Sequence, residues 1–104
     1  MKTAIAVALI AAATVAMPAA HADAADDQFV NALAAQGIVR DRATTIQAGH
    51  TVCDNTARMA TTLPGYSKMA SIGDVVNTLQ IPINQAAFVI SAARNAYCPQ
   101  FNGL

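Results

Sequence analysis

The chain has 104 residues, with six Lys or Arg side chains against six acidic ones, all Asp, and a formal net charge of zero. This length allows one small domain. A chain with no positive excess lacks the electrostatic footprint of a nucleic-acid-binding protein, so we expect no nucleic-acid partner. Apolar residues make up 55% of the chain and charged residues 12%, a composition that argues against intrinsic disorder.

Residues 1–22 have the three-part pattern of a secretory signal peptide. Lys2 supplies a positive charge near the start, residues 4–16 are apolar except for one Thr, and Ala20 and Ala22 place small side chains where a signal peptidase reads them. The apolar stretch is shorter than the roughly 20 residues that a transmembrane helix needs. We therefore expect cleavage after Ala22.

Cleavage at this point leaves residues 23–104 as a single helical domain, which we expect to be secreted and either extracellular or associated with the cell wall. No later stretch is long and apolar enough to act as a transmembrane anchor once the signal is removed. Because the domain is small, its hydrophobic core alone gives marginal stability, and a covalent cross-link would help.

The two cysteines, Cys53 and Cys98, both lie in this domain. In an oxidising compartment an even number of cysteines indicates a disulfide, and closing the loop between them would stabilise the fold by about 4 kcal/mol in the chain-entropy description. The rival interpretation is a metal site that adds His50, three residues before Cys53. Two thiolates and one imidazole are too few for a closed structural zinc site, so we expect a disulfide, no metal and no cofactor.

Helical periodicity predicts the first two helices. The first begins near Asp23 or Asp26 and ends at Gly37, and the second runs from about Asp41 to about Ala60. The apolar stripe of the second helix on a helical wheel consists of Ile46, Gly49, Cys53, Ala57 and Ala60.

Two details of the second helix lead to further expectations. Gly49 costs about 1 kcal/mol relative to Ala inside a helix, so we expect another helix to approach closely at this position. Asp54 and Arg58 have the spacing of an ion pair on the polar side.

Two more helices follow. Residues 63–66 (LPGY) are typical of a turn, and Ser71 with Asp74 resembles a capping box that would open a short third helix. The last helix is expected from Pro82 to about Tyr97, with an apolar stripe broad enough for a central helix. That stripe comprises Ile83, Ala86, Ile90, Ala93 and Tyr97. The sequence thus predicts an all-α, four-helix domain with one disulfide, preceded by a cleavable signal peptide.

Three stretches carry a family resemblance: residues 27–33 (DQFVNAL) before Gly37, residues 49–53 (GHTVC) and residues 92–99 (AARNAYCP). With the Ala-rich signal peptide, they resemble the mycobacterial family of small secreted proteins called domain of unknown function 732. The most specific part is the Tyr-Cys-Pro of the last stretch paired with the Val-Cys of the second. The resemblance implies a secreted, helical, disulfide-linked single domain of actinobacterial origin, and it brings no established activity or catalytic residues.

The sequence contains few candidate catalytic residues. His50 lies one helical turn before Asp54, which could orient its imidazole, so one alternative is a small hydrolase or transferase centred on these two residues. The serines of the domain lie in no recognised nucleophile motif, and both cysteines are expected to be oxidised. We therefore favour a structural role, in which His50 borders the core and bonds to Asp54 or to backbone, and expect the protein not to be an enzyme.

Four apolar side chains are candidates for a binding surface. Phe88 falls on the polar side of the last helix, where an exposed ring would anchor a partner or an apolar ligand. Met59, Tyr66 and Met69 lie near the Pro-Gly turn and would add an adaptable apolar rim. For all four side chains, burial in the core is the more common role.

The leading hypothesis is a non-catalytic secreted module that binds a protein or an apolar envelope molecule. The alternatives are the enzyme centred on His50 and Asp54 and a structural cell-envelope protein with no small ligand. A concave apolar pocket exposing Phe88 or the Met side chains would favour the binding hypothesis.

Overall fold

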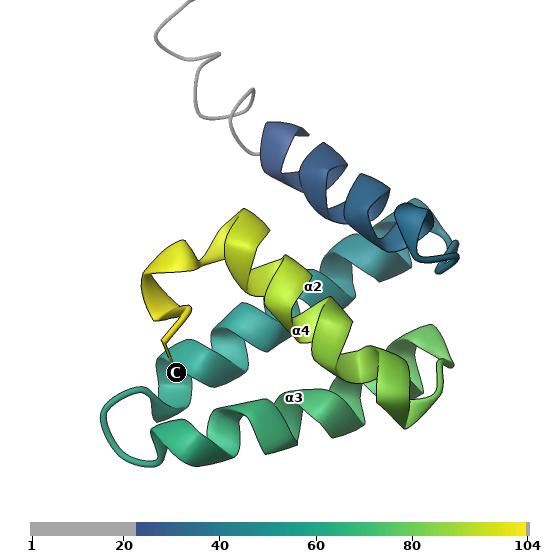
Figure 1. Ribbon diagram of the computed structural model, residues 1–104. Coiled ribbons are helices and arrows are strands. Elements are labelled where there is room, and N and C mark those ends of the chain that lie inside the picture. The colour runs from purple at the N-terminus through teal and green to yellow at the C-terminus, as the bar shows by residue number, and fades with distance from the viewer. Residues whose placement is uncertain (1–22, 104) are drawn as a thin grey trace, which may run out of the picture.

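Figure 1 shows the computed structural model of the protein, which describes residues 23–103. Residues 1–22, the expected signal peptide, lie outside the described residues, as does Leu104. The expected all-α architecture of four helices is confirmed, and no strand occurs within residues 23–103. The elements are a first helix at residues 23–35, α2 (Arg42–Met59), α3 (Pro64–Leu79), α4 (Ile83–Tyr97) and the short 3₁₀ helix η1 (Pro99–Phe101).

The boundary between the first helix and α2 lies where the sequence places it. Gly37 has a φ of 81°, a left-handed conformation that glycine adopts without a Cβ clash and that ends helices. Asp41 precedes α2, and its carboxylate accepts a hydrogen bond from the Thr44 backbone N–H at 3.1 Å. This contact satisfies one of the free N–H groups at the start of the helix.

The third helix is longer than predicted. It begins at Pro64, within the expected turn, because proline is well tolerated in the first helical turn, where its missing N–H is not needed. The capping-box prediction is therefore wrong: Ser71 lies in the middle of α3 and is buried. There its hydroxyl accepts a hydrogen bond of 3.4 Å from the Asn55 side chain, which also donates to Asp74 at 2.9 Å.

The buried face of α2 is rotated from the predicted stripe. Ala57 is exposed and Cys53 is half-buried, whereas Asn55 and Thr56 are buried. A wheel built on apolar residues misses this face because part of it is polar. Thr56 donates to the Val52 carbonyl at 2.8 Å, which removes most of the cost of burying a hydroxyl.

The last helix lies in the middle of the domain, as expected. α4 packs against both α2 and α3, and the first helix adds the fully buried Phe29 and Leu33 to the same core. One residue of α4 differs from the prediction, because Ile83, placed on the apolar stripe, is exposed. Ile83 is the first residue of the helix and points to solvent, whereas Ile81, two residues earlier, is buried in the core. Arg94, for which no position was predicted, is buried.

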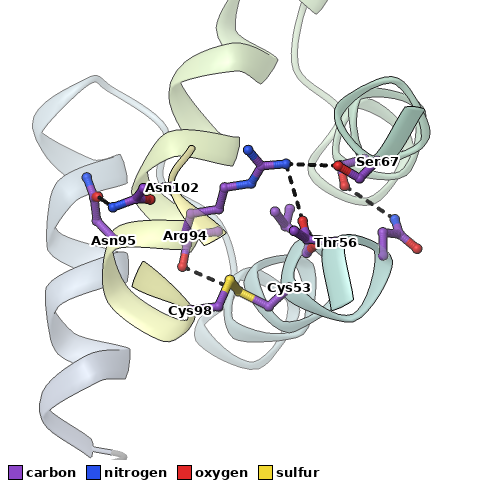
Figure 2. Close-up of a disulfide and its surroundings, with 11 residues drawn as sticks. Cys53, Thr56, Ser67, Arg94, Asn95, Cys98 and Asn102 are labelled. Carbon is purple, nitrogen blue, oxygen red and sulfur yellow. Dashed lines mark hydrogen bonds between the residues drawn. A yellow bond between two sulfur atoms is a disulfide. The ribbon is translucent and has the colours of Figure 1, made fainter. Parts of the chain in front are cut away.

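The predicted disulfide is confirmed. Cys53 in the second half of α2 is bonded to Cys98, which immediately follows α4, and the two Cα atoms are 6.0 Å apart. Figure 2 shows the bond between these two helices. It therefore ties α2, whose buried face is partly polar, to the helix at the centre of the core.

Loss of this bond is expected to lower the stability of the domain strongly. Replacing both Cys53 and Cys98 by Ala should reduce the free energy of unfolding by about 4 kcal/mol, because the unfolded chain gains the freedom that the closed loop denies it. Thermal unfolding followed by circular dichroism, with and without reductant, measures the effect. Equal melting temperatures of the wild-type protein in the two conditions would contradict the prediction.

The expected close approach at Gly49 is also confirmed, but aromatic rings, not another helix backbone, occupy the space. A Cβ added at Gly49 would lie 2.7 Å from Cε2 of Tyr97 and 2.8 Å from Cε2 of Phe29. The Phe29 and Tyr97 rings lie 5.5 Å apart, tilted by 60°, a common arrangement for aromatic pairs. The absence of a side chain on α2 therefore gives both rings their place in the core.

Replacing Gly49 by Ala should destabilise the domain by about 1–2 kcal/mol, because the clash with two rings outweighs the gain in helix propensity. Gly73→Ala is the matched control: Gly73 is also inside a helix, but no atom lies within 4 Å of an added Cβ, so this variant should be stabilised by up to about 1 kcal/mol. Urea unfolding measures both. Equal stabilisation of the two variants would show that the rings do not require the glycine.

Candidate functional site

Three large apolar side chains are exposed where α3 begins. Leu63, which precedes the helix, is 54% exposed, Tyr66 is 57% exposed and Met69 is 66% exposed. Tyr66 and Met69, three residues apart, lie in successive turns on one side of α3, and Leu63 precedes Tyr66 by the same spacing. We call these three residues the α3 apolar face.

The inner side of α3 explains why these side chains point outward. Ser67 and Ser71 are both completely buried, and their small volume lets α3 lie close to α2 and α4. The Ser67 hydroxyl donates to the Pro64 carbonyl at 2.8 Å. Over its first two turns, α3 thus buries small polar residues and exposes large apolar ones, the reverse of the usual preference.

A buried arginine of α4 forms a hydrogen bond with this buried side of α3. Arg94 is only 3% exposed, and Figure 2 shows its side chain reaching from α4 to Thr56 and Ser67. One guanidinium nitrogen donates to the two hydroxyls at 3.3 and 3.2 Å. Nε has no hydrogen-bond partner among the described residues. Burial lowers the pKa of Arg94 from its usual value.

Sequence reasoning missed Arg94 as a core residue, because an arginine is rarely buried without a charged partner. The sequence feature that indicates its burial is its position, four residues after Ile90 and three before Tyr97. That spacing places it close to the buried stripe of α4. Its hydrogen bonds to α2 and α3 hold the serine side of α3 against the core.

The structure brings together two of the four apolar candidates. Tyr66 and Met69 share the α3 apolar face, and Leu63, which was assigned to the turn, joins them because the helix starts earlier than predicted. Met59, the last residue of α2, is half-buried. Phe88 is 36% exposed, but it lies on α4 and therefore is not part of the α3 apolar face.

His50 and Asp54 are both exposed on α2. The imidazole of His50 lies against the ring of Tyr97, with 4.3 Å between the ring centres and a tilt of 36°, and no hydrogen bond joins His50 to Asp54 within residues 23–103. The expected Asp54–Arg58 pair does not form either, because Arg58 donates to the side chain of Asn55 instead. Asn55 is on the buried face of α2, one turn from Arg58.

Tyr97 also anchors the first helix. Its hydroxyl donates to the Asp26 carboxylate at 2.5 Å, and nearby Arg42 of α2 pairs with Asp27 at 2.8 Å. Burial and the Asp26 carboxylate raise the pKa of Tyr97 well above its ordinary value of 10.0. The first helix is therefore joined to both α2 and α4 by polar contacts outside the core.

This raised pKa predicts a loss of stability in alkali. The folded state favours the protonated phenol, so its contribution is complete below the unfolded pKa of about 10 and declines as the pH rises beyond that value. The free energy of unfolding should therefore fall above this pH, and fall less in Tyr97→Phe. Urea unfolding over a series of alkaline pH values measures the slope.

The control for this experiment is Tyr66→Phe, which removes an exposed tyrosine far from the Asp26 contact in the sequence. This variant should keep the wild-type pH dependence. Parallel profiles for wild type and Tyr97→Phe would contradict the role given to the Tyr97–Asp26 hydrogen bond.

Neither a small-molecule cavity nor a cluster of three or more metal-ligating side chains is found in residues 23–103. The concave apolar pocket considered above is thus not found in this region, and the α3 apolar face lies on the outer surface of a helix. None of the helices in the described part of the chain has the length and apolar character needed to cross a membrane.

Comparison with protein-family models gives a match. A family model described as "Protein of unknown function (DUF732)" matches residues 25–100, a range that extends from the first helix into η1 and includes both cysteines. No curated protein and no solved structure matches the chain.

Proposed function

The chain belongs to the DUF732 family, whose function is not known, and we propose that it is a secreted, non-catalytic module that binds a protein or an apolar envelope molecule through the α3 apolar face. The observation that carries the proposal is the reversed burial at the start of α3. There Ser67 is completely buried, while Tyr66 and Met69 on either side of it in the sequence are more than half exposed.

Isolated exposed apolar residues are ordinary on protein surfaces. Val39 and Ile83 are examples, each 70% exposed but on separate segments. The α3 apolar face differs because its members follow one another at a spacing of three residues, Leu63 just before α3 and Tyr66 and Met69 within it. Large apolar and aromatic side chains that are grouped in this way are typical anchors of binding surfaces.

Secretion is supported by two features. Residues 1–22 have the signal-peptide pattern described above, and the Cys53–Cys98 disulfide is typical of proteins that reside in oxidising compartments. We therefore propose that the mature domain begins at Asp23 and acts outside the cytoplasmic membrane, either released or associated with the cell wall.

A non-catalytic role accords with the surroundings of His50. The ring that lies against His50 belongs to Tyr97, whose hydroxyl already donates to Asp26. In a hydrolase or transferase, His50 would act as the base, and it would need a free hydroxyl close enough for the imidazole to accept its proton. The structural-protein alternative is separated from binding by the experiment that follows.

The test is capture of the ligand by protein purified from the medium of cells that express the full chain. Wild type and Tyr66→Ser/Met69→Ser are incubated with culture filtrate and with envelope extract, and mass spectrometry identifies the retained proteins and lipids. We expect a reproducible ligand whose recovery falls at least about tenfold in the variant, because its apolar anchors are lost.

The matched control is Val39→Ser/Ile83→Ser, which removes two equally exposed apolar side chains from other segments and should retain the ligand as wild type does. Circular dichroism confirms that all three proteins are folded. Failure to retain any ligand reproducibly, or equal recovery by the Tyr66/Met69 variant, would overturn the proposed function.

A further inference from the structure

The charges around the α3 apolar face indicate more specifically which class of ligand it binds. Arg58 lies in the last turn of α2 and Lys68 lies in the first turns of α3, and both are exposed. Between Asp54 and Asp74 the sequence contains no acidic residue. The segment that carries the apolar face therefore has only positive side-chain charges.

The acidic residues are concentrated elsewhere. Four of the six Asp residues lie in the first helix or immediately before α2: Asp23, Asp26, Asp27 and Asp41. The eighteen residues of α2 span about 27 Å, which separates these carboxylates from Arg58. Figure 1 shows the start of α2 beside the first helix, and the α2–α3 connection at the opposite end of α2.

The two remaining carboxylates lie further along their helices from the apolar face than the two cations do. Asp54 precedes Arg58 by one helical turn, about 6 Å along the axis, and Asp74 follows Lys68 by about 9 Å. Asp74 is also engaged, because it accepts a hydrogen bond of 2.9 Å from Asn55. In addition, the first turn of α3 contains no acidic residue, so the positive end of its helix dipole is not neutralised there.

The size of the apolar face separates a lipid surface from a folded protein partner. At about 200 Å² for a fully exposed large side chain, the three residues leave roughly 350 Å² accessible. A stable protein interface, including one with a second copy of this chain, buries about 800 Å² on each partner. A second copy would also bring Arg58 and Lys68 close to their own counterparts.

A bilayer places fewer demands on such a surface. Its headgroup region surrounds protruding side chains without needing a complementary shape, and roughly 350 Å² of apolar area is enough for reversible attachment when positive charge assists. Tyrosine is favoured at this depth, because its ring is apolar and its hydroxyl remains hydrated.

We propose that the α3 apolar face, flanked by Arg58 and Lys68, docks the domain on a lipid surface that carries anionic headgroups. Leu63, Tyr66 and Met69 enter the headgroup region, and the two cations contact phosphate. This inference rests on the proposed function, since it names the class of ligand that the same face binds. The acidic first helix then faces away from the membrane.

The first test is sedimentation of the mature protein, purified from the medium of cells that express the full chain, with vesicles of phosphatidylcholine, with and without phosphatidylglycerol. We expect binding only to the anionic vesicles, decreasing with added salt. Tyr66→Ser/Met69→Ser should lower the partition coefficient at least about tenfold, and Lys68→Gln should lower it about fivefold. Val39→Ser/Ile83→Ser should bind as wild type does.

A second measurement remains valid if a polar variant fails to fold. The chain contains no Trp, so Tyr66→Trp introduces a single fluorescent reporter into the apolar face, and Val39→Trp places one at an exposed control site. Anionic vesicles should shift the emission of Tyr66→Trp to the blue, and brominated lipids should quench it. The emission of Val39→Trp should not change.

Equal binding to neutral and anionic vesicles, no binding to either, or unchanged emission of Tyr66→Trp would overturn the lipid inference. If vesicle binding is absent but a protein is captured in a manner that depends on Tyr66 and Met69, the lipid inference fails and the proposed function stands. If neither vesicles nor any other ligand are bound, both fail.

Discussion

The bond between Cys53 and Cys98 is the constraint on which the arrangement of the helices depends. It joins α2 to the end of α4, and one turn further along α2 the same two helices are joined again by the Arg94–Thr56 hydrogen bond of 3.3 Å. The buried side of α2 contains polar residues and a glycine, so burial of apolar area alone holds this helix weakly. The covalent bond supplies what this core lacks, because it restricts the unfolded chain.

The surface of α3 follows from that arrangement. With α2 and α4 fixed, the Arg94 side chain reaches Ser67 at 3.2 Å, and Asn55 reaches Ser71 at 3.4 Å. Small hydroxyl side chains are what this space accommodates, so the large residues at the start of α3 are directed to solvent. The proposed binding surface is therefore a consequence of how the polar part of the core is satisfied. Arg58 and Lys68 then give this end of the domain its positive charge.

Much of the fold could be predicted from the sequence. Asp41, Gly37 and the cysteine pair carry local signals with direct physical meanings, and the structure has each of them in the expected role. The errors concern the start of α3, where Ser71 is buried in mid-helix and caps nothing, and the buried faces of α2 and α4, where Ala57 and Ile83 are exposed. An apolar wheel cannot show which polar side chains find partners inside. Tyr66 and Met69 were candidates from the start, but sequence alone could not separate an exposed residue from a core residue.

The account requires that the exported chain has lost its signal peptide and closed its disulfide. Intact-mass spectrometry of the protein recovered from the culture medium, before and after alkylation of free thiols, tests both requirements at once. The mass should equal that of residues 23–104 less two hydrogen atoms, with no alkylation. A mass that includes residues 1–22, or alkylation of both cysteines without prior reduction, would contradict it.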